Sequence, residues 1–280
     1  MITIFFHHRR LSTGVATLIA GLAVAVPGMA ATSPWAVSDG GRMRVVALAP
    51  DAAGMVRAGL QIEPAPGWIT YWREPGDSGI PPQVTVTPGD GVTLDSLSFP
   101  VPKRVDQGEV RDIGYDAAVT LPMVLHVDAG AQPSGFTTQV FIGLCKNICI
   151  PFQAELPASL AVATQSEPDE AAILDAAAAL LPEAPSADFA VAGFAMAADR
   201  SALRLDLVLP KGSTTPPEVI VTGPNGYVFT RHDAGTVTAK GLSVTLPIAR
   251  LPKTYILAGK RWGVLVKAGG RAMETTLAFD

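Results

Sequence analysis

The sequence predicts an all-β protein built from two immunoglobulin-like β-sandwiches joined by a short helical linker. Glycine and proline are abundant, with 27 and 24 residues among the 280. Valine, threonine and isoleucine fall in short alternating runs, as they do in strands that have one buried face. Turn signals such as Pro64-Ala65-Pro66-Gly67 separate these runs at regular intervals. Short strands broken by regular turns are typical of a β-sandwich.

The first thirty residues predict an export signal. His7-His8-Arg9-Arg10 supplies the positive start, residues 11–26 are apolar, and Gly28-Met29-Ala30 offers a cleavage site after Ala30. The alternative is an uncleaved membrane anchor, but an apolar run of about sixteen residues is shorter than the ~20 that span a bilayer. We therefore expect a cleaved signal over residues 1–30, a periplasmic location and no stable membrane insertion after cleavage.

The first domain is expected over residues 31–165. Turns rich in proline and glycine at 75–79, 88–91 and 132–135 divide it. The strands predicted between these turns are 43–46, 56–63, 69–72, 83–87, 93–99, 118–127 and 137–144.

A helical linker is expected over residues 166–184. Ser166-Glu167-Pro168-Asp169 is a capping signature, the helix covers 170–181, and Pro182 ends it. A second, smaller sandwich is expected over 185–280, with a hairpin turn at Pro224-Asn225-Gly226-Tyr227. Its predicted strands are 202–209, 218–221, 228–230, 242–247, 254–257, 262–266 and 274–279.

Charge and motifs exclude several classes of function. The net charge is −4 and there is no basic run, so nucleic acid and anionic lipid are not expected partners. The sequence holds no phosphate-binding loop and no nucleophile elbow. Outside the signal, His126 and His232 are the only histidines, which is too few for a zinc site. We therefore expect no cofactor, and we expect any catalysis to be thiol chemistry.

Cys145 and Cys149 are the only cysteines, and strands are predicted on both sides of the pair. Along one extended strand, residues four apart are roughly 13 Å from each other, which is beyond the reach of a disulfide. The pair can bridge only if the chain reverses at Lys146-Asn147-Ile148, and Asn147 tolerates the left-handed conformation that such turns often need. In an oxidising compartment a disulfide is the expected resting state.

The residues alone leave the role of this pair open. A loop this short stabilises a fold by only about 2 kcal/mol in the chain-entropy model. Cross-strand bridges lie near the limits of disulfide geometry and are readily reduced, and the Lys146 ammonium would favour a thiolate if it turned toward the sulfurs. A redox pair, a structural clip and a two-thiolate Cu(I) site all remain possible interpretations.

Three blocks of sequence occur in order: residues 67–81 (GWITYWREPGDSGIP), Gly114-Tyr115 with 119–122 (VTLP), and residues 143–151 (GLCKNICIP). Together they resemble the amino-terminal periplasmic domain of the disulfide reductase family that includes DsbD. The resemblance is greatest to the branch known as suppressor of copper sensitivity protein B, in which a second sandwich follows. It implies an immunoglobulin-like fold with Cys145 and Cys149 as the exchanging pair and Cys145 as the sulfur that a partner attacks.

The resemblance also implies partners. Family members take electrons from a membrane-embedded domain and pass them by thiol-disulfide exchange to periplasmic oxidoreductases with a thioredoxin fold. Neither a membrane domain nor a thioredoxin-like domain is predicted here, so we expect a separate membrane electron carrier to deliver the electrons. The alternative is a non-enzymatic periplasmic binding or assembly module, linked to copper tolerance, whose disulfide is structural.

Family members shield the cysteines with a cap loop, and the matching stretch is 105–115. It holds Asp106, Glu109 and Asp112, and it lacks the covering phenylalanine, which Tyr115 can replace only in part. Carboxylates beside the cysteines would raise the thiol pKa values and restrain attack until a partner docks. The alternative interpretation is that these acids lie in a solvated loop.

An aromatic patch lies in the first of these blocks. Strand alternation places Trp68 and Trp72 on one face and Tyr71 on the other. Packing in the core is the favoured interpretation, over a surface that docks a partner. Arg73 is expected to pair with Asp77 across the following turn, which would contribute little if the pair is exposed.

Overall fold

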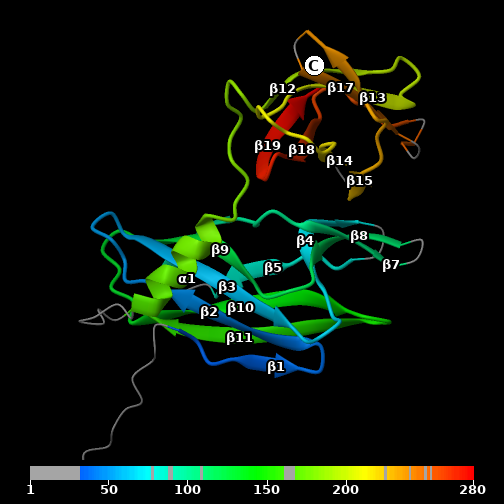
Figure 1. The fold of residues 1–280 in the computed structure, drawn as a ribbon. Helices are drawn as coiled ribbons and strands as arrows, with labels where there is room; N and C mark the ends of the chain where they lie inside the picture. Colours follow the sequence, from blue (N-terminus) through cyan, green and yellow to red (C-terminus); the bar gives the residue numbers. More distant parts are fainter. Residues whose placement is uncertain are drawn as a thin grey trace, which may run out of the picture.

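The computed structural model describes residues 32–76, 79–87, 91–107, 110–160, 168–223, 226–239, 241–248, 251–252 and 254–280. The predicted signal at 1–30 lies outside these residues. Strands β1–β11 and strands β12–β19 form separate sets of antiparallel sheets, with helix α1 between them in the chain (Figure 1). The prediction of an all-β chain with two sandwiches joined by a helix is confirmed. Within the described residues, no helix is long and apolar enough to span a bilayer.

The first sandwich packs a five-stranded sheet, in the order β1-β2-β3-β9-β6, against two three-stranded sheets, β11-β10-β5 and β4-β8-β7. A bridge between Ile69 and Cys145 connects the two smaller sheets. The strands are β1 (Ala36–Ser38), β2 (Gly41–Ala47), β3 (Met55–Pro64), β4 (Thr70–Gly76), β5 (Gln83–Val86), β6 (Val92–Leu97), β7 (Lys103–Gln107), β8 (Val110–Tyr115), β9 (Val119–Val127), β10 (Gly135–Cys145) and β11 (Cys149–Ser159).

Alternation along the strands builds the first core. In β9, Val119, Leu121, Met123 and Leu125 are buried and the residues between them are not, which is the period of two expected of a strand with one buried face. The two smaller sheets supply the opposite side of this core, with Trp72, Phe136, Val140 and Ile142 among its buried residues.

The segment expected to be a cap loop is instead the hairpin of β7 and β8, paired from Lys103↔Gly114 to Gln107↔Val110. These strands were not predicted because β7 holds one apolar residue, Val105, and the apolar alternation of β8 is limited to Ile113 and Tyr115. The short strand β1 was also not predicted.

Strand β11 lies at the edge of its sheet and carries Pro151 and Pro157. The two prolines are an even number of positions apart, so their nitrogens point to the same side of the strand. Pairing with β10 is continuous along the whole of β11, so that side faces away from β10. The outer edge of β11 therefore lacks two N–H donors.

Helix α1 (Pro168–Ala178) packs on β2, β3 and β9 of the first sandwich. Leu174 and Ala177 are its buried apolar side chains. A Cβ atom at Gly59 would lie 2.8 Å from Leu174 Cδ2, so the glycine allows the helix to approach β3 closely. Glu170 accepts a hydrogen bond of 2.5 Å from the Thr32 hydroxyl. The segment expected to be a connector thus also covers one face of the first sandwich.

The second sandwich consists of two four-stranded sheets, β12-β13-β17-β16 and β15-β14-β18-β19. The predicted strand at 254–257 is wrong, because these residues form a turn and loop from which Tyr255 and Leu257 pack against the core. The strands are β12 (Ala190–Met196), β13 (Ala202–Val208), β14 (Glu218–Gly223), β15 (Tyr227–Phe229), β16 (Thr236–Thr238), β17 (Gly241–Pro247), β18 (Arg261–Ala268) and β19 (Arg271–Ala278). Strands β12 and β16 were not predicted.

The two sandwiches share an apolar contact. In β14, Val219 and Val221 face the second core, whereas Ile220 between them joins the core of the first sandwich. Leu265 of β18 does the same. Because these strands are buried on both faces, their sequences are continuous apolar runs. Lys267 Nζ also donates to the Pro102 carbonyl at 3.2 Å across this contact.

The linker is fastened to the second sandwich by Arg271, which binds Glu183 at 2.6 Å and Asp188 at 2.7 Å. Hydrogen bonds from Arg271 lower the pKa of both carboxyls, that of Asp188 to about 2. A carboxyl with a depressed folded-state pKa stabilises the fold above its unfolded pKa and ceases to do so as the pH falls through the folded value.

We predict that Arg271→Gln lowers the midpoint of thermal unfolding at pH 7, and that the difference from wild type shrinks as the pH falls from about 4 through about 2, the folded-state pKa of Asp188. Thermal unfolding followed by circular dichroism across this range measures it. Arg204→Gln is the control, because Arg204 makes one loose ion pair of 3.6 Å with Asp206 and its loss should have little effect. A gap between Arg271→Gln and wild type that is as large at pH 2 as at pH 7 would contradict the prediction.

Candidate functional site

The two cysteines face each other at the end of a β-hairpin. Strands β10 and β11 pair along their whole length, and the last pair is Cys145↔Cys149. The two residues form a disulfide with their Cα atoms 4.1 Å apart. Lys146 N–H donates to the Ile148 carbonyl at 3.1 Å and closes the three-residue turn. The expected chain reversal is therefore present.

The turn does not use the left-handed conformation that Asn147 tolerates. Among the described residues, Arg200 is the one non-glycine residue with a positive φ. The chain reversal is thus made with ordinary backbone angles.

The backbone of Cys145 is held on its second side by Ile69. Ile69 N–H donates to the Cys145 carbonyl at 2.8 Å, and Cys145 N–H donates to the Ile69 carbonyl at 3.0 Å. This pair of bonds brings the start of β4 beside the disulfide. The side chains of Ile69, Tyr71 and Cys145 form a small buried cluster of their own, and Val105 of β7 packs against it.

The two cysteines differ in exposure. Cys145 is only 3% exposed, whereas Cys149 is an exposed residue. Its neighbour Ile148, at the tip of the hairpin, is 68% exposed. Cys149 is thus the more exposed residue of the pair, whereas the sequence resemblance implied that a partner attacks Cys145.

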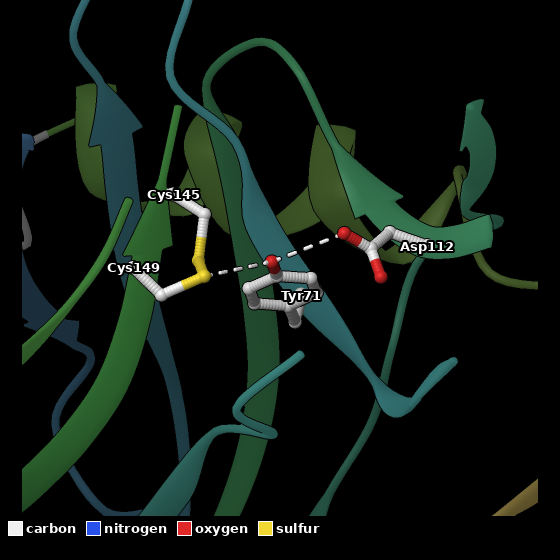
Figure 2. Close-up of a disulfide and its surroundings, with 4 residues drawn as sticks. All are labelled: Tyr71, Asp112, Cys145 and Cys149. Atoms are coloured by element: carbon white, nitrogen blue, oxygen red, sulfur yellow. Dashed lines mark hydrogen bonds between the residues drawn. A yellow bond between two sulfur atoms is a disulfide. The ribbon is translucent and has the colours of Figure 1, made fainter. Parts of the chain in front are cut away.

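The hydroxyl of Tyr71 lies between the disulfide and a buried carboxylate (Figure 2). It is 3.5 Å from Cys149 Sγ and donates to Asp112 Oδ2 at 3.2 Å. Both Tyr71 and Asp112 are buried. Burial, and after it the negative charge of Asp112, raises the pKa of Tyr71 far above its ordinary value. The phenol therefore keeps its proton at any physiological pH.

Two glycines, Gly79 and Gly143, leave room for the ring of Tyr71. A Cβ atom at Gly79 would lie 2.4 Å from Tyr71 Cδ1, and one at Gly143 would lie 3.2 Å from Tyr71 Cδ2. Real Cβ atoms do not come as near as the first of these distances. Only glycine at position 79 leaves room for the ring in the place from which its hydroxyl contacts Cys149.

Of the residues predicted to modulate the cysteines, Lys146 and Tyr115 do not reach the sulfurs. Lys146 turns away from the sulfurs, because its Nζ donates to the Pro66 carbonyl at 3.4 Å. Tyr115 lies in the main core and its hydroxyl donates to the Pro100 carbonyl at 2.8 Å. The side chain of Asp106 and the whole of Glu109 lie outside the described residues.

Asp112 is the member of the acidic stretch that reaches the site. It is only 4% exposed, so it does not lie in a solvated loop. Trp72 packs in the core as expected, on the opposite face of β4 from Tyr71. Tyr71 was not predicted to be a site residue. The signal that could have identified it is its position in the first resembling block, on the opposite strand face from Trp68 and Trp72.

No group of three or more histidine, cysteine or acidic side chains in the described part of the chain is arranged to hold a metal ion. The groups that meet at the site are the two sulfurs, the phenol of Tyr71 and the carboxylate of Asp112.

We predict that Gly79→Ala lowers the free energy of unfolding by about 1–3 kcal/mol, the usual range for overpacking, because the new methyl group displaces Tyr71 and Pro75. Urea unfolding measures the loss. Gly193→Ala is the matched control, since a Cβ atom there meets only Asp206 Oδ2, at an ordinary 3.6 Å. Equal stability of the two variants would show that the ring is not held as described.

Comparison with known proteins identifies the first sandwich. Residues 43–160 match the family model described as thiol:disulfide interchange protein DsbD, N-terminal. A search of curated proteins found no match. Among solved structures, the N-terminal periplasmic domain of ScsB from Proteus mirabilis is similar with a TM-score of 0.71 at 23% sequence identity, over 90% of this chain and 100% of that one. That likeness shows a shared fold through both sandwiches. The resemblance to the DsbD amino-terminal domain is thus confirmed over residues 43–160.

Proposed function

We propose that this protein is a periplasmic thiol-disulfide interchange protein that relays reducing equivalents through Cys145 and Cys149 to a partner with a thioredoxin fold. The observation that carries the proposal is a disulfide between a buried and an exposed cysteine, beside a buried phenol and carboxylate, within residues that match the DsbD amino-terminal family model. A disulfide that only stabilised the hairpin would need neither the exposed cysteine nor the buried phenol and carboxylate. The periplasmic location is supported by the shared fold with the ScsB amino-terminal domain, which is a periplasmic domain.

The disulfide of Cys145 and Cys149 would be reduced by a dithiol donor. We propose that this donor is a separate membrane electron carrier. A donor thiolate attacks the Sγ atom of Cys149, the exposed cysteine, and the bond between the two cysteines breaks with its electrons on Cys145. The donor's second thiolate then attacks the donor sulfur of the mixed disulfide and releases Cys149. The donor becomes a disulfide, and its two electrons and two protons now reside on Cys145 and Cys149.

The reduced pair would then pass these electrons on. The Cys149 thiolate attacks a sulfur of the partner's disulfide and releases one partner thiolate. Cys145 attacks Cys149 Sγ in the mixed disulfide, re-forms the internal bond and releases the second partner thiol. The second step is fast because the hairpin and the Ile69 backbone hold Cys145 opposite Cys149, with the Cα atoms 4.1 Å apart.

Tyr71 and Asp112 would control when the thiol reacts. In the reduced protein the Cys149 thiol can donate to the Tyr71 oxygen, while the Tyr71 hydroxyl donates to Asp112. A hydrogen bond to the protonated sulfur and a nearby negative charge both raise a thiol pKa. Cys149 is therefore held as an unreactive thiol until a docked partner displaces this arrangement.

We predict that Cys145→Ser accumulates a mixed disulfide through Cys149 with a thioredoxin-fold protein in a periplasmic extract, because the resolving sulfur is missing. Non-reducing electrophoresis followed by mass spectrometry detects it. Cys149→Ser is the matched control and should trap far less, since Cys145 is buried. If neither variant traps a partner while both fold normally, and the wild-type disulfide resists reduction below roughly −300 mV, the disulfide is structural and the relay is rejected.

We also predict that Asp112→Asn lowers the thiol pKa of Cys149 in the reduced protein, because it removes the buried negative charge. The rate of alkylation at neutral pH should rise by about tenfold for each unit by which the pKa falls. Iodoacetamide alkylation followed across pH 6–11 in the Cys145→Ser background measures it, since Cys149 is then the only thiol. An unchanged pH profile would remove Asp112 from the mechanism.

A further inference from the structure

The second sandwich reaches the site through an irregular stretch of β4. Strand β4 pairs with β8 at Tyr71↔Gly114, and the pairing resumes only at Gly76↔Asp112. Four residues of β4, 72–75, thus stand opposite a single residue of β8. We call this interruption of the pairing, residues 72–75, the β4 excursion. The strand pairs that flank it contain Tyr71 on β4 and Asp112 on β8, the two partners of the buried hydrogen bond. Whatever fixes the excursion therefore fixes how the phenol meets the carboxylate.

Side chains of the first sandwich hold only part of this excursion. Trp72 is buried in the core, and Pro75 is buried near the ring of Tyr71, because a Cβ atom at Gly79 would meet both residues at 2.4 Å. Arg73 lies between them in sequence, with its guanidinium 4.0 Å from the centre of the Trp72 ring and 5.9 Å from that of Phe99. Stacking of this kind attracts a cation but does not fix it along the ring face.

The second sandwich supplies the anchor for Arg73. Glu274 of β19 forms an ion pair with the Arg73 guanidinium, and the two side chains are 27% and 31% exposed. Glu274 is itself fixed, because its N–H donates to the Glu183 carbonyl at 3.0 Å and its strand partner is Leu265. Leu265 is one of the residues that pack in the core of the first sandwich. The carboxylate is thus held in place at the contact between the two sandwiches.

We infer that Arg73 is a positioning residue for the Tyr71 hydroxyl, and that Glu274 of the second sandwich holds it there. This inference rests on the proposed function, because it assigns the second sandwich a part in setting the reactivity of Cys149. Without Glu274, the half-buried guanidinium of Arg73 loses its ion-pair partner and keeps only the attraction of Glu74, and the irregular stretch of β4 loses its link to the second sandwich. The hydrogen bond between Tyr71 and Asp112 then loosens, and the thiol of Cys149 is less strongly held in its protonated form.

The test is the pH profile of Cys149 alkylation by iodoacetamide in the full-length Cys145→Ser protein. Glu274→Gln should raise the rate at neutral pH by about two- to fivefold, the size expected when residues couple through shared contacts. Combined with Asp112→Asn, it should add nothing further, since both changes act on the same hydrogen bond. Glu274→Asp keeps the charge and should restore most of the original rate. Urea unfolding of each variant establishes that it is folded.

The control is Lys267→Gln, which removes a polar contact across the same boundary without touching β4. If Lys267→Gln raises the rate as much as Glu274→Gln does, general loosening of the boundary is responsible and the inference is wrong. If Glu274→Gln changes nothing while Asp112→Asn shifts the profile, the inference also fails but the proposed function stands. Failure of the proposed function shows separately, as the absence of any trapped partner with Cys145→Ser.

Discussion

The two backbone hydrogen bonds between Ile69 and Cys145 are the constraint on which the site depends. They join two sheets that would otherwise lie side by side, and they do so one residue before the disulfide turn. Because β4 leaves this bridge in an extended conformation, Tyr71 emerges on the face where Cys149 lies. The neighbouring Trp72 points into the main core and anchors the strand. The reactive hairpin and its phenol are therefore placed by the same two bonds.

The three resembling blocks of sequence meet at a single ring. The first block contributes Tyr71 and Gly79, and the third contributes Gly143 and both cysteines. Gly114 of the second block pairs with Tyr71, and a Cβ atom there would come within 2.1 Å of the Thr70 carbonyl. What these glycines have in common is that a larger residue would push Tyr71 or its strand out of place. The blocks thus describe one packing requirement around the phenol.

The fold class and the chain reversal at the cysteines could be predicted because both follow from the spacing of residues along the sequence. Strand spacing and the short interval between Cys145 and Cys149 leave few alternatives. The hairpin of β7 and β8 could not be found in this way, because only Ile113 and Tyr115 of its short strands join the main core and charged residues fill most of the other positions. The partners of Tyr71 and Arg73 were missed for another reason: Asp112 and Glu274 are distant in the sequence, and only the folded chain brings them close. The continuous apolar runs of β14 and β18 signalled burial but not that two different cores share them.

The prolines of β11 have a consequence for which molecules can use the site. A long outer strand next to an exposed cysteine would invite an extended polypeptide to pair with it, and an unfolded chain bearing a cysteine could then be captured nonspecifically. Pro151 and Pro157 remove donors that such a visitor would need. For the relay proposed above, this edge favours partners that arrive already folded and present their own sulfur on a rigid surface.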